Sequence, residues 1–327
     1  MNKKKKYPLK LSYVAKNALW AGKRLKEEFG KKTEHETISE SWELTVRSDE
    51  MSRVLNGAAK GMTLAQYFDR FGYDCVTPHF QKGNRFPLLI KLIDANDVLS
   101  VQVHPDDTYA RAVEHDSGKT EMWYVIDAKK GASLIYGLKD GIGKEKFAKA
   151  IAQGKIGETV NEISVQPGDT YFIPSGMTHA IGAGILIAEI QQNADLTYRV
   201  YDFDRVGADG KKRELHVEKA LDVIRPFSEE EIDAIRYARG RTPTSGELLA
   251  NSDYFSVQKL IISEQGEGET VNVTPDSFVS VLCIDGDGEI DFDGESYPVC
   301  KGDSYFLPAG MGACRLTGST TVILSRC

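Results

Sequence analysis

Short apolar segments rich in β-branched and aromatic residues recur in two parts of the chain and predict two series of β-strands. Between residues 86 and 200 the segments are FPLLIKLI, VLSVQVH, MWYVI, SLIYGL, DTYFIP and ILIAEIQ, separated by Gly, Asp and Pro. From residue 254 to the end they are FSVQKLII, FVSVLCI, GEIDFDG, DSYFLP and TTVILS. Two series of short strands with turn signals between them predict a mainly β fold of two sandwich or barrel units.

Helical periodicity is confined to the segments that connect these strands. The predicted helices cover residues 63–70, 106–114, 144–152, 217–222 and 229–239. The last begins at a capping signal, Ser228, and is followed by a polar stretch containing Pro and Gly. We therefore expect the linker there, with an N-terminal domain over residues 1–238, including N-terminal strands and helical additions, and a second domain over 239–327.

The chain contains one pattern twice, as PGDTYFIPSGMTHA at 167–180 and KGDSYFLPAGMGAC at 301–314. In each copy, Gly-Asp predicts a turn into a strand, and Pro-x-Gly predicts a tight turn at the end of that strand. The first copy then places His179 where the turn directs it inward, whereas the second has Ala313 at the corresponding position. An internal repeat of this kind predicts two barrels of the same type, with a metal ligand only in the first.

Three further residues in the first series are candidate ligands for the same metal. Gln102 and His104 are two residues apart in VLSVQVH and share one face of that strand, and Glu121 begins the strand in GKTEMWYVI. Each alone is commonly a core or surface group, but together with His179 they offer two imidazole nitrogens and two oxygens. That donor set suits a borderline divalent metal, and we predict one Zn²⁺ per chain. The other histidines, expected to be structural, are His35, His79, His115 and His216.

Composition and charge narrow the possible functions. The formal net charge of −7 disfavours a nucleic-acid surface, so an anionic ligand would need a local group of cations. No apolar stretch is long enough to cross a membrane, and KYPLKLSYVAKN after the basic N-terminus lacks the core of an export signal. The five cysteines form no C-x-x-C pair, which favours reduced, buried thiols in a cytoplasmic protein. The stretch 285–294, DGDGEIDFDG, lacks the glycine of a calcium loop and predicts a hairpin turn.

Several motifs resemble those of a known family. The repeated stretch resembles the second motif of the cupin superfamily. ESWELT (40–45), FPLLIKLIDANDVLSVQVHPDD (86–107), GKTEMWYVI (118–126) and EIQQNADLTYRVYDFDR (189–205) resemble type I phosphomannose isomerases, specifically the short bacterial form, and the similarity spans nearly the whole chain. It implies two cupin barrels with helical additions, bound zinc, and interconversion of mannose 6-phosphate and fructose 6-phosphate through an enediolate. The sequence departs from the expected pattern at Asn193, Ala194 and Leu196.

The resemblance also implies roles for individual residues. The family's metal ligands fall on Gln102, His104, Glu121 and His179, its active-site arginine on Arg199, and a carboxylate on Glu189. Its pocket lysines fall on Lys91 and Lys119, with the hydroxyl of Ser100 nearby. We expect Glu189, raised in pKa by burial, to be the base, unless it is a structural partner of Arg199. The implied catalytic residues are Arg199, Glu189 and Lys119. The implied phosphate-binding residues are Lys91, Ser100, Lys119 and Arg199.

Two other functions remain compatible with two such barrels. One is a non-catalytic protein that binds sugar phosphates, in which the metal only stabilises the fold. The other is a metal-dependent oxygenase, which Gln102 and the two lysines disfavour because redox iron is usually held by histidines with or without a carboxylate.

We expect a small sugar phosphate as ligand, neither nucleic acid nor membrane as partner, and a monomer or weak homo-oligomer.

Overall fold

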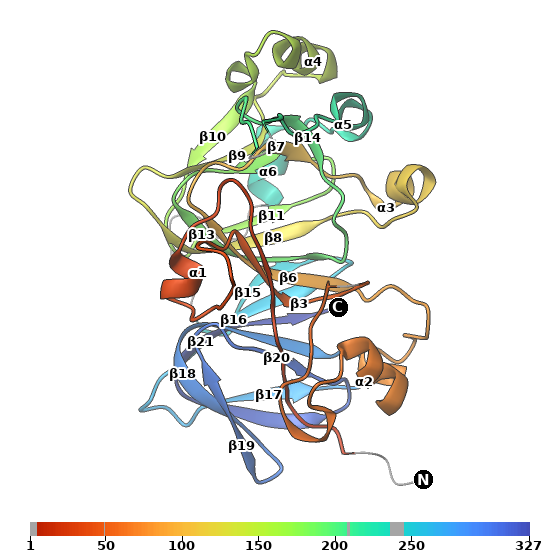
Figure 1. Ribbon diagram of the computed structural model, residues 1–327, viewed down its shortest axis with the longest axis vertical. Coiled ribbons are helices and arrows are strands. Elements are labelled where there is room, and N and C mark those ends of the chain that lie inside the picture. Colours follow the sequence, from red (N-terminus) through yellow and green to blue (C-terminus); the bar gives the residue numbers. More distant parts are fainter. Residues whose placement is uncertain (1–4, 49, 208–209, 236–244) are drawn as a thin grey trace.

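Two β units are stacked along the long axis of the molecule, the N-terminal unit above and the C-terminal unit below in Figure 1. The computed structural model describes residues 5–48, 50–207, 210–235 and 245–327. The expected mainly β architecture with short helical additions is confirmed. The expected boundary at 238/239 lies outside the described residues, so this division of the chain stays a prediction.

The N-terminal unit contains two antiparallel sheets that enclose one apolar core. The six-stranded sheet has the order β11-β8-β13-β6-β3-β2, and the five-stranded sheet has the order β10-β9-β12-β7-β14. Their strands are β2 (Val14–Lys16), β3 (Glu40–Leu44), β6 (Leu88–Ala95), β7 (Val101–Val103), β8 (Glu121–Ala128), β9 (Ser133–Leu138), β10 (Val160–Ser164), β11 (Thr170–Ile173), β12 (His179–Ile181), β13 (Ile185–Gln192) and β14 (Tyr198–Tyr201). Two short strands, β4 (Val46–Arg47) and β5 (Glu50–Met51), pair separately.

The unbroken apolar character of β6 and β13 follows from burial on both faces. All residues of both strands are buried. Along β13, Ile187 packs into the core between the two sheets of the N-terminal unit, whereas its neighbours Leu186 and Ala188 join a second core shared with the C-terminal unit. A strand covered on both sides loses the polar alternation of a half-exposed strand. The two charged residues within these strands that face the first core, Lys91 and Glu189, are therefore exceptional.

The C-terminal unit is a single eight-stranded antiparallel sheet with a filled interior. Its strands are β1 (Leu9–Lys10), β15 (Glu247–Asn251), β16 (Ser256–Ile262), β17 (Glu269–Val273), β18 (Val279–Phe292), β19 (Glu295–Cys300), β20 (Ser304–Leu307) and β21 (Gly312–Arg326). The predicted strands FVSVLCI and GEIDFDG are one strand, β18, with a bulge at Cys283–Asp285. The predicted hairpin turn at 285–294 is therefore wrong for most of that stretch. Only Asp293 and Gly294, with φ of 51° and 79°, make the turn.

The predicted helices are present with small shifts at their ends. The helices are α1 (Arg24–Glu27), which was not predicted, α2 (Leu64–Phe71), α3 (Asp107–Tyr109) continued by a π turn (Ala110–Glu114), α4 (Lys144–Ala152), α5 (Val217–Val223) and α6 (Glu229–Ile235). Short 3₁₀ turns lie at Gly57–Ala59, Tyr73–Cys75 and Ile156–Glu158. Ser228 Oγ accepts from the Glu231 amide, which confirms the capping signal. The expected extension of the last helix over 236–239 lies outside the described residues.

The two units share a strand and an aromatic core. β1, near the N-terminus, pairs with β20, so the first strand of the chain belongs to the sheet of the C-terminal unit. Between the units, Phe86 packs on Phe278 at 5.3 Å between ring centroids, and Phe278 stacks on Phe306 at 4.9 Å. Because these rings come from both ends of the chain, the units fold onto one another through non-local contacts.

Candidate active site

Strand pairing places the predicted site residues in two rows, one on each sheet of the N-terminal unit. In the six-stranded sheet, Lys91 of β6 lies opposite Glu189 of β13, which lies opposite Trp123 of β8. In the five-stranded sheet, His179 of β12 and Arg199 of β14 both lie opposite Gln102 of β7. Side chains alternate between the two faces of a strand, so register alone brings each row to one face.

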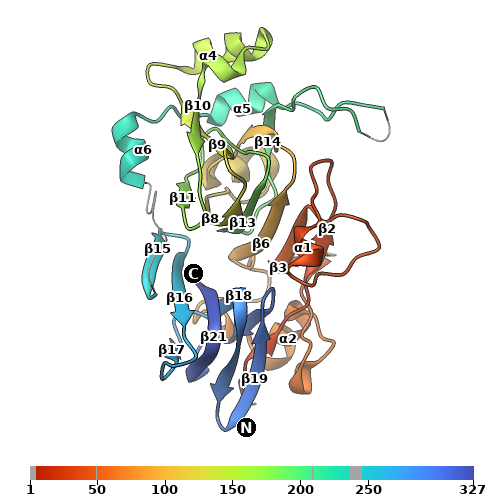
Figure 2. The same ribbon diagram turned by 90° about the vertical axis from the view of Figure 1, so that its left-hand side faces the viewer.

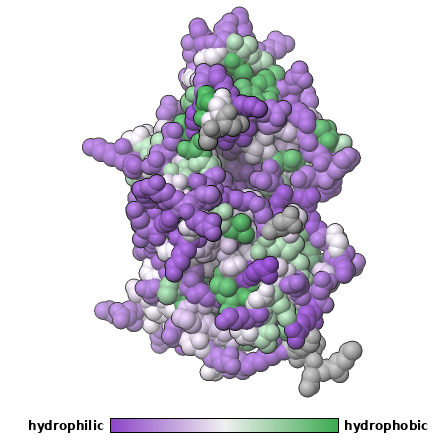
Figure 3. All heavy atoms as spheres, in the orientation of Figure 1, coloured by the Kyte–Doolittle hydropathy of each residue, from purple (hydrophilic) through white to green (hydrophobic). Residues whose placement is uncertain are grey.

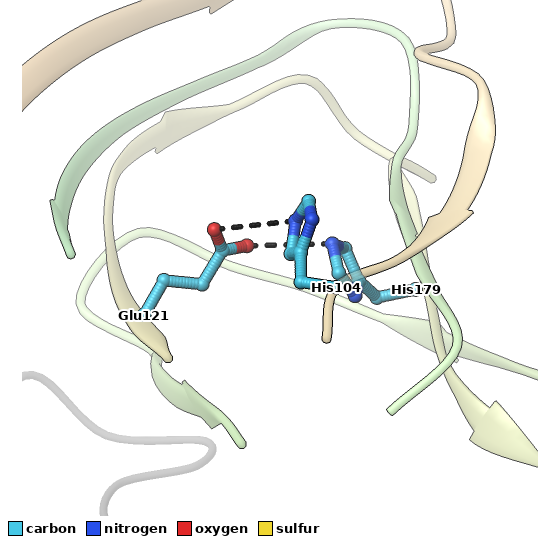
Figure 4. A group of neighbouring side chains, drawn as sticks. All are labelled: His104, Glu121 and His179. Atoms are coloured by element: carbon cyan, nitrogen blue, oxygen red, sulfur yellow. Dashed lines mark ion pairs between the residues drawn. The ribbon is translucent and has the colours of Figure 1, made fainter. Parts of the chain in front are cut away.

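His104, Glu121 and His179 converge in a buried cluster, shown in Figure 4. Their ligand atoms all lie within 4.8 Å of one another. The His104 Nε2 atom is 3.6 Å from Glu121 Oε2, and the His179 Nε2 atom is 3.4 Å from Glu121 Oε1. Glu121 is the first residue of β8, as expected, and His104 follows directly after β7.

The hydrogen bonds that the two histidines make at Nδ1 leave both Nε2 atoms unprotonated. His104 Nδ1 is 2.7 Å from the Leu196 carbonyl oxygen, and His179 Nδ1 is 2.9 Å from that of Met177. A carbonyl can only accept, so each Nδ1 carries the proton and each Nε2 is unprotonated and can accept a hydrogen bond or bind a metal. Burial lowers the pKa of both imidazoles, that of His179 to about 4, which keeps them neutral.

A divalent metal fits this donor set. Glu121 Oε1 is buried and receives no hydrogen bond from the described residues, and it faces the unprotonated Nε2 of His179. Such acceptors crowded together in a dry core are unfavourable without a cation between them. Burial raises the pKa of Glu121 to about 7, and the nearby Glu189 charge acts in the same direction. A bound cation would hold this carboxyl ionised.

Gln102 and Lys119 border the cluster. The side-chain amide of Gln102 lies 3.4 Å from His179 Nε2, and turning that amide over brings its oxygen to the same place. Lys119 Nζ lies 2.8 Å from Glu121 Oε2 and 3.2 Å from His104 Nε2. All four predicted ligands and the predicted catalytic lysine are thus brought together.

Glu189 is paired with Lys91 and not with Arg199. Lys91 Nζ is 3.1 Å from Glu189 Oε1 and 3.3 Å from Glu40 Oε2, while the Trp123 indole donates to Glu189 Oε2 at 3.0 Å. Burial alone would raise the pKa of Glu189, but Lys91 and then Lys119 outweigh it and lower the pKa to about 2. The expectation of a carboxyl with a raised pKa is therefore wrong, because the neighbouring ammonium groups reverse the effect of burial.

A polar cavity of about 330 Å³ lies beside the Lys91–Glu189 pair and Lys119. It is lined by every predicted binding residue, namely Lys91, Ser100, Lys119 and Arg199, together with Gln102 and Glu189. Arg199 Nε donates to Ser100 Oγ at 3.3 Å, and its NH1 donates to the Glu214 carbonyl at 2.9 Å. The cavity also contains residues that sequence reasoning missed. Glu40 lies in the quoted motif ESWELT, where it could have been found, whereas Arg213 lies in a segment without any motif.

The remaining chemically reactive residues lie outside this site. In the described part of the chain, His35, His79, His115 and His216 join no group of three metal-ligating side chains. All five cysteines are free, as expected, but Cys300 and Cys327 are exposed, which corrects the expectation that they are buried. Among the described helices, none is both long and apolar enough to cross a membrane.

Comparison with known proteins places the chain in a family. The family model described as "Phosphomannose isomerase type I, catalytic domain" matches residues 9–136, and "Mannose-6-phosphate isomerase, cupin domain" matches residues 245–327. The mannose-6-phosphate isomerase of Streptococcus mutans is 40% identical over 97% of this chain and 98% of its own length. The chain belongs to the type I phosphomannose isomerase family. The resemblance inferred from the motifs and the expected cupin fold are both confirmed.

Further relatives are similar to this chain over nearly the whole of both chains. The Bacillus subtilis protein named mannose-6-phosphate isomerase ManA is 38% identical over 97% of this chain and 98% of its own length. The crystal structure of a mannose 6-phosphate isomerase from Bacillus subtilis superposes with a TM-score of 0.85 at 34% identity, covering 97% of this chain and 99% of that one. A putative mannosephosphate isomerase from Archaeoglobus fulgidus, at 19% identity and a TM-score of 0.76, shares the fold over 98% of this chain and 97% of its own.

Proposed function

We propose that this type I phosphomannose isomerase interconverts mannose 6-phosphate and fructose 6-phosphate in the cavity of the N-terminal unit, with one Zn²⁺ held by Gln102, His104, Glu121 and His179. The observation that carries the proposal is the convergence of both bare histidine nitrogens on a buried Glu121, beside a cavity lined by cations and by the ionised Glu189. When bound, the metal would supply a Lewis acid for the oxygens of the reacting carbons.

Glu189 is the proposed base. The reaction requires removal of a proton from the carbon next to the carbonyl and its return to the neighbouring carbon. Glu189 is ionised because Lys91 balances its charge, and the Trp123 indole fixes its second oxygen. An ionised carboxylate held at both oxygens can accept a proton at a defined position.

Cations around the cavity are proposed to bind the substrate. Arg199 and Lys119 would stabilise the negative charge that develops on the enediolate oxygens. Lys91, Ser100, Lys119 and Arg199 together give the cavity wall the donors that a phosphate ester requires, although the chain as a whole is acidic.

The free thiols and the absence of a membrane-spanning helix among those described are compatible with the cytoplasmic enzyme that we expect.

A coupled assay with a metal chelator tests this proposal. The purified chain should form fructose 6-phosphate from mannose 6-phosphate, should lose that activity after chelation, and should regain it when Zn²⁺ is restored. Metal analysis should find one zinc per chain before chelation and none in a His179→Ala variant. A protein that contains its metal but gives no turnover would contradict the isomerase and favour the non-catalytic sugar-phosphate-binding protein.

A further inference from the structure

The positive charges of the cavity are unevenly balanced. Lys91 forms ion pairs with two carboxylates, Glu189 and Glu40, and Lys119 forms one with Glu121. In the described part of the chain, Arg199 has no carboxylate within ion-pair distance, and its side chain instead donates to a hydroxyl and a backbone carbonyl. The positive charge available for a further anion therefore lies at the arginine side of the cavity.

Two more arginines share one carboxylate next to Arg199. Arg213 donates from Nε to Asp202 Oδ2 at 2.7 Å and from NH2 to Asp202 Oδ1, and Arg205 NH2 lies 2.5 Å from the same Oδ1. The Asp202 side chain is 6% exposed and the Arg213 side chain 28% exposed. The three arginines and this one paired carboxylate form a group in which positive charge is in excess, as the roughly −1.5 to −2 of a phosphate ester at neutral pH requires.

The local backbone holds this group in place. Asp202 follows β14 directly, so it is anchored to the strand that carries Arg199. The next two residues, Phe203 and Asp204, both have left-handed backbones, with φ of 54° and 53°. Consecutive left-handed residues other than glycine are costly and persist only where the surroundings require them. The turn they make brings Arg205 back onto Asp202, and Arg213 returns to the same carboxylate along the segment that leads to α5, on the right in Figure 2.

We propose that Arg213 binds the phosphate group of the substrate together with Arg199 and Ser100, and that Asp202 is a positioning residue that holds the Arg213 guanidinium toward the cavity. This assignment rests on the proposed function, and it makes Arg213 a determinant of specificity for phosphorylated over free sugars. A planar guanidinium that donates through one edge to Asp202 still has N–H donors for phosphate oxygens.

Steady-state kinetics of Arg213→Gln test the proposal. Because a hydrogen bond to a charged group contributes substantially to binding, KM for mannose 6-phosphate should rise roughly ten- to a hundredfold, with kcat changed less than about threefold. The inhibition constant of inorganic phosphate should rise by a similar factor. Lys212→Gln is the matched control, since it removes the same charge from the adjacent position, where the side chain is 63% exposed and pairs with Asp204. Its KM should equal that of the wild type.

A folded Arg213→Gln variant with the wild-type KM and phosphate inhibition would overturn the role of Arg213 while leaving the isomerase intact. If that variant does not fold, Arg213→Lys decides, because it keeps the charge but loses the forked donors. A several-fold higher phosphate inhibition constant in that variant supports the proposal, and an unchanged one overturns it.

Thermal unfolding with inorganic phosphate separates this inference from the proposed function. Stabilisation of the wild type but not of Arg213→Gln would support the phosphate site even in a protein without turnover.

Discussion

At the scale of single residues, two backbone carbonyls define the chemistry of the proposed metal site. The carbonyls of Leu196 and Met177 accept from Nδ1 of His104 and His179, which directs both Nε2 lone pairs toward Glu121. Such outer contacts orient metal ligands and set their tautomers. A backbone carbonyl is present whatever the side chain, so the departure of the sequence from the family pattern at Leu196 leaves this contact intact.

The pairing of Lys91 with Glu189 leads to a prediction about pH dependence. With Lys91 present, the pKa of Glu189 is about 2, so the carboxylate is ionised at every higher pH. In Lys91→Gln, Glu189 stays buried but loses the ammonium group that most lowers its pKa, so the pKa of Glu189 should rise. The carboxyl would then become protonated, and kcat/KM would fall, at a higher pH than in the wild type.

Measurement of kcat/KM between pH 5 and 9 checks this prediction. Lys91→Gln should show an acid limb within this range, above any limb of the wild type, because burial without the ion pair can raise a carboxyl pKa by several units from its value of about 2. Lys60→Gln, at an exposed position, serves as the control and should leave the profile unchanged. An acid limb that stays in place would argue that Glu189 does not titrate as the base.

At the scale of elements, the repeated turn shows what differs between the two copies. Gly176 has φ of 85°, and its amide donates to the His104 carbonyl at 2.8 Å, so the turn joins the segments of two proposed metal ligands. Gly310, its counterpart, has φ of 69° and donates to the Thr274 carbonyl at 2.8 Å. The same local geometry therefore lies beside the proposed metal site in one unit, whereas its copy in the other unit has no histidine at the position of His179.

Alanine at these two glycines should have different effects. Both substitutions place a side chain at positive φ and should cost roughly 1 to 2 kcal/mol of stability. The added carbon would lie 3.0 Å from the Val223 carbonyl oxygen at Gly176, but no closer than 3.6 Å to any neighbour at Gly310. Gly176→Ala should therefore also displace the turn and lower zinc content and activity, whereas Gly310→Ala should keep both. Equal zinc content in both variants would contradict a role of this turn in the metal site.

At the scale of the whole molecule, the C-terminal unit supports the N-terminal one from outside. Its interior is filled with apolar side chains such as Val281, Ile290 and Leu316, and Ala313, the counterpart of His179, is exposed. Its outer face covers the apolar residues of β6 and β13 that point away from the cavity. The face of the molecule in Figure 3 is predominantly hydrophilic, with hydrophobic residues in small groups.

Loss of one ring at this interface should destabilise both units together. Phe278 is fully buried, and Phe278→Ala should reduce the free energy of unfolding by about 3 to 5 kcal/mol. KM of the folded protein should not change, because Phe278 does not line the cavity. Urea unfolding followed by fluorescence and by zinc release should give coincident transitions, with Leu248→Ala, at a half-exposed position, as a nearly neutral control. Unfolding of the C-terminal unit with the zinc site still intact would show that the two units are independent.

The sequence by itself determined the two strand series, the repeated turn and the residues that are proposed to bind the metal. These features depend on local rules, because alternation places Gln102 and His104 on one side, and a Pro-x-Gly turn has few possible shapes. Motif similarity determined the family and the residues that line the cavity. Only the tertiary structure decided which groups pair with each other. Lys91 rather than Arg199 neutralises Glu189, β1 joins the sheet of the distant unit, and Arg213 enters the cavity from a segment without a motif. Charge balance and pKa depend on distances between strands that are far apart in the sequence, and no local pattern encodes those distances.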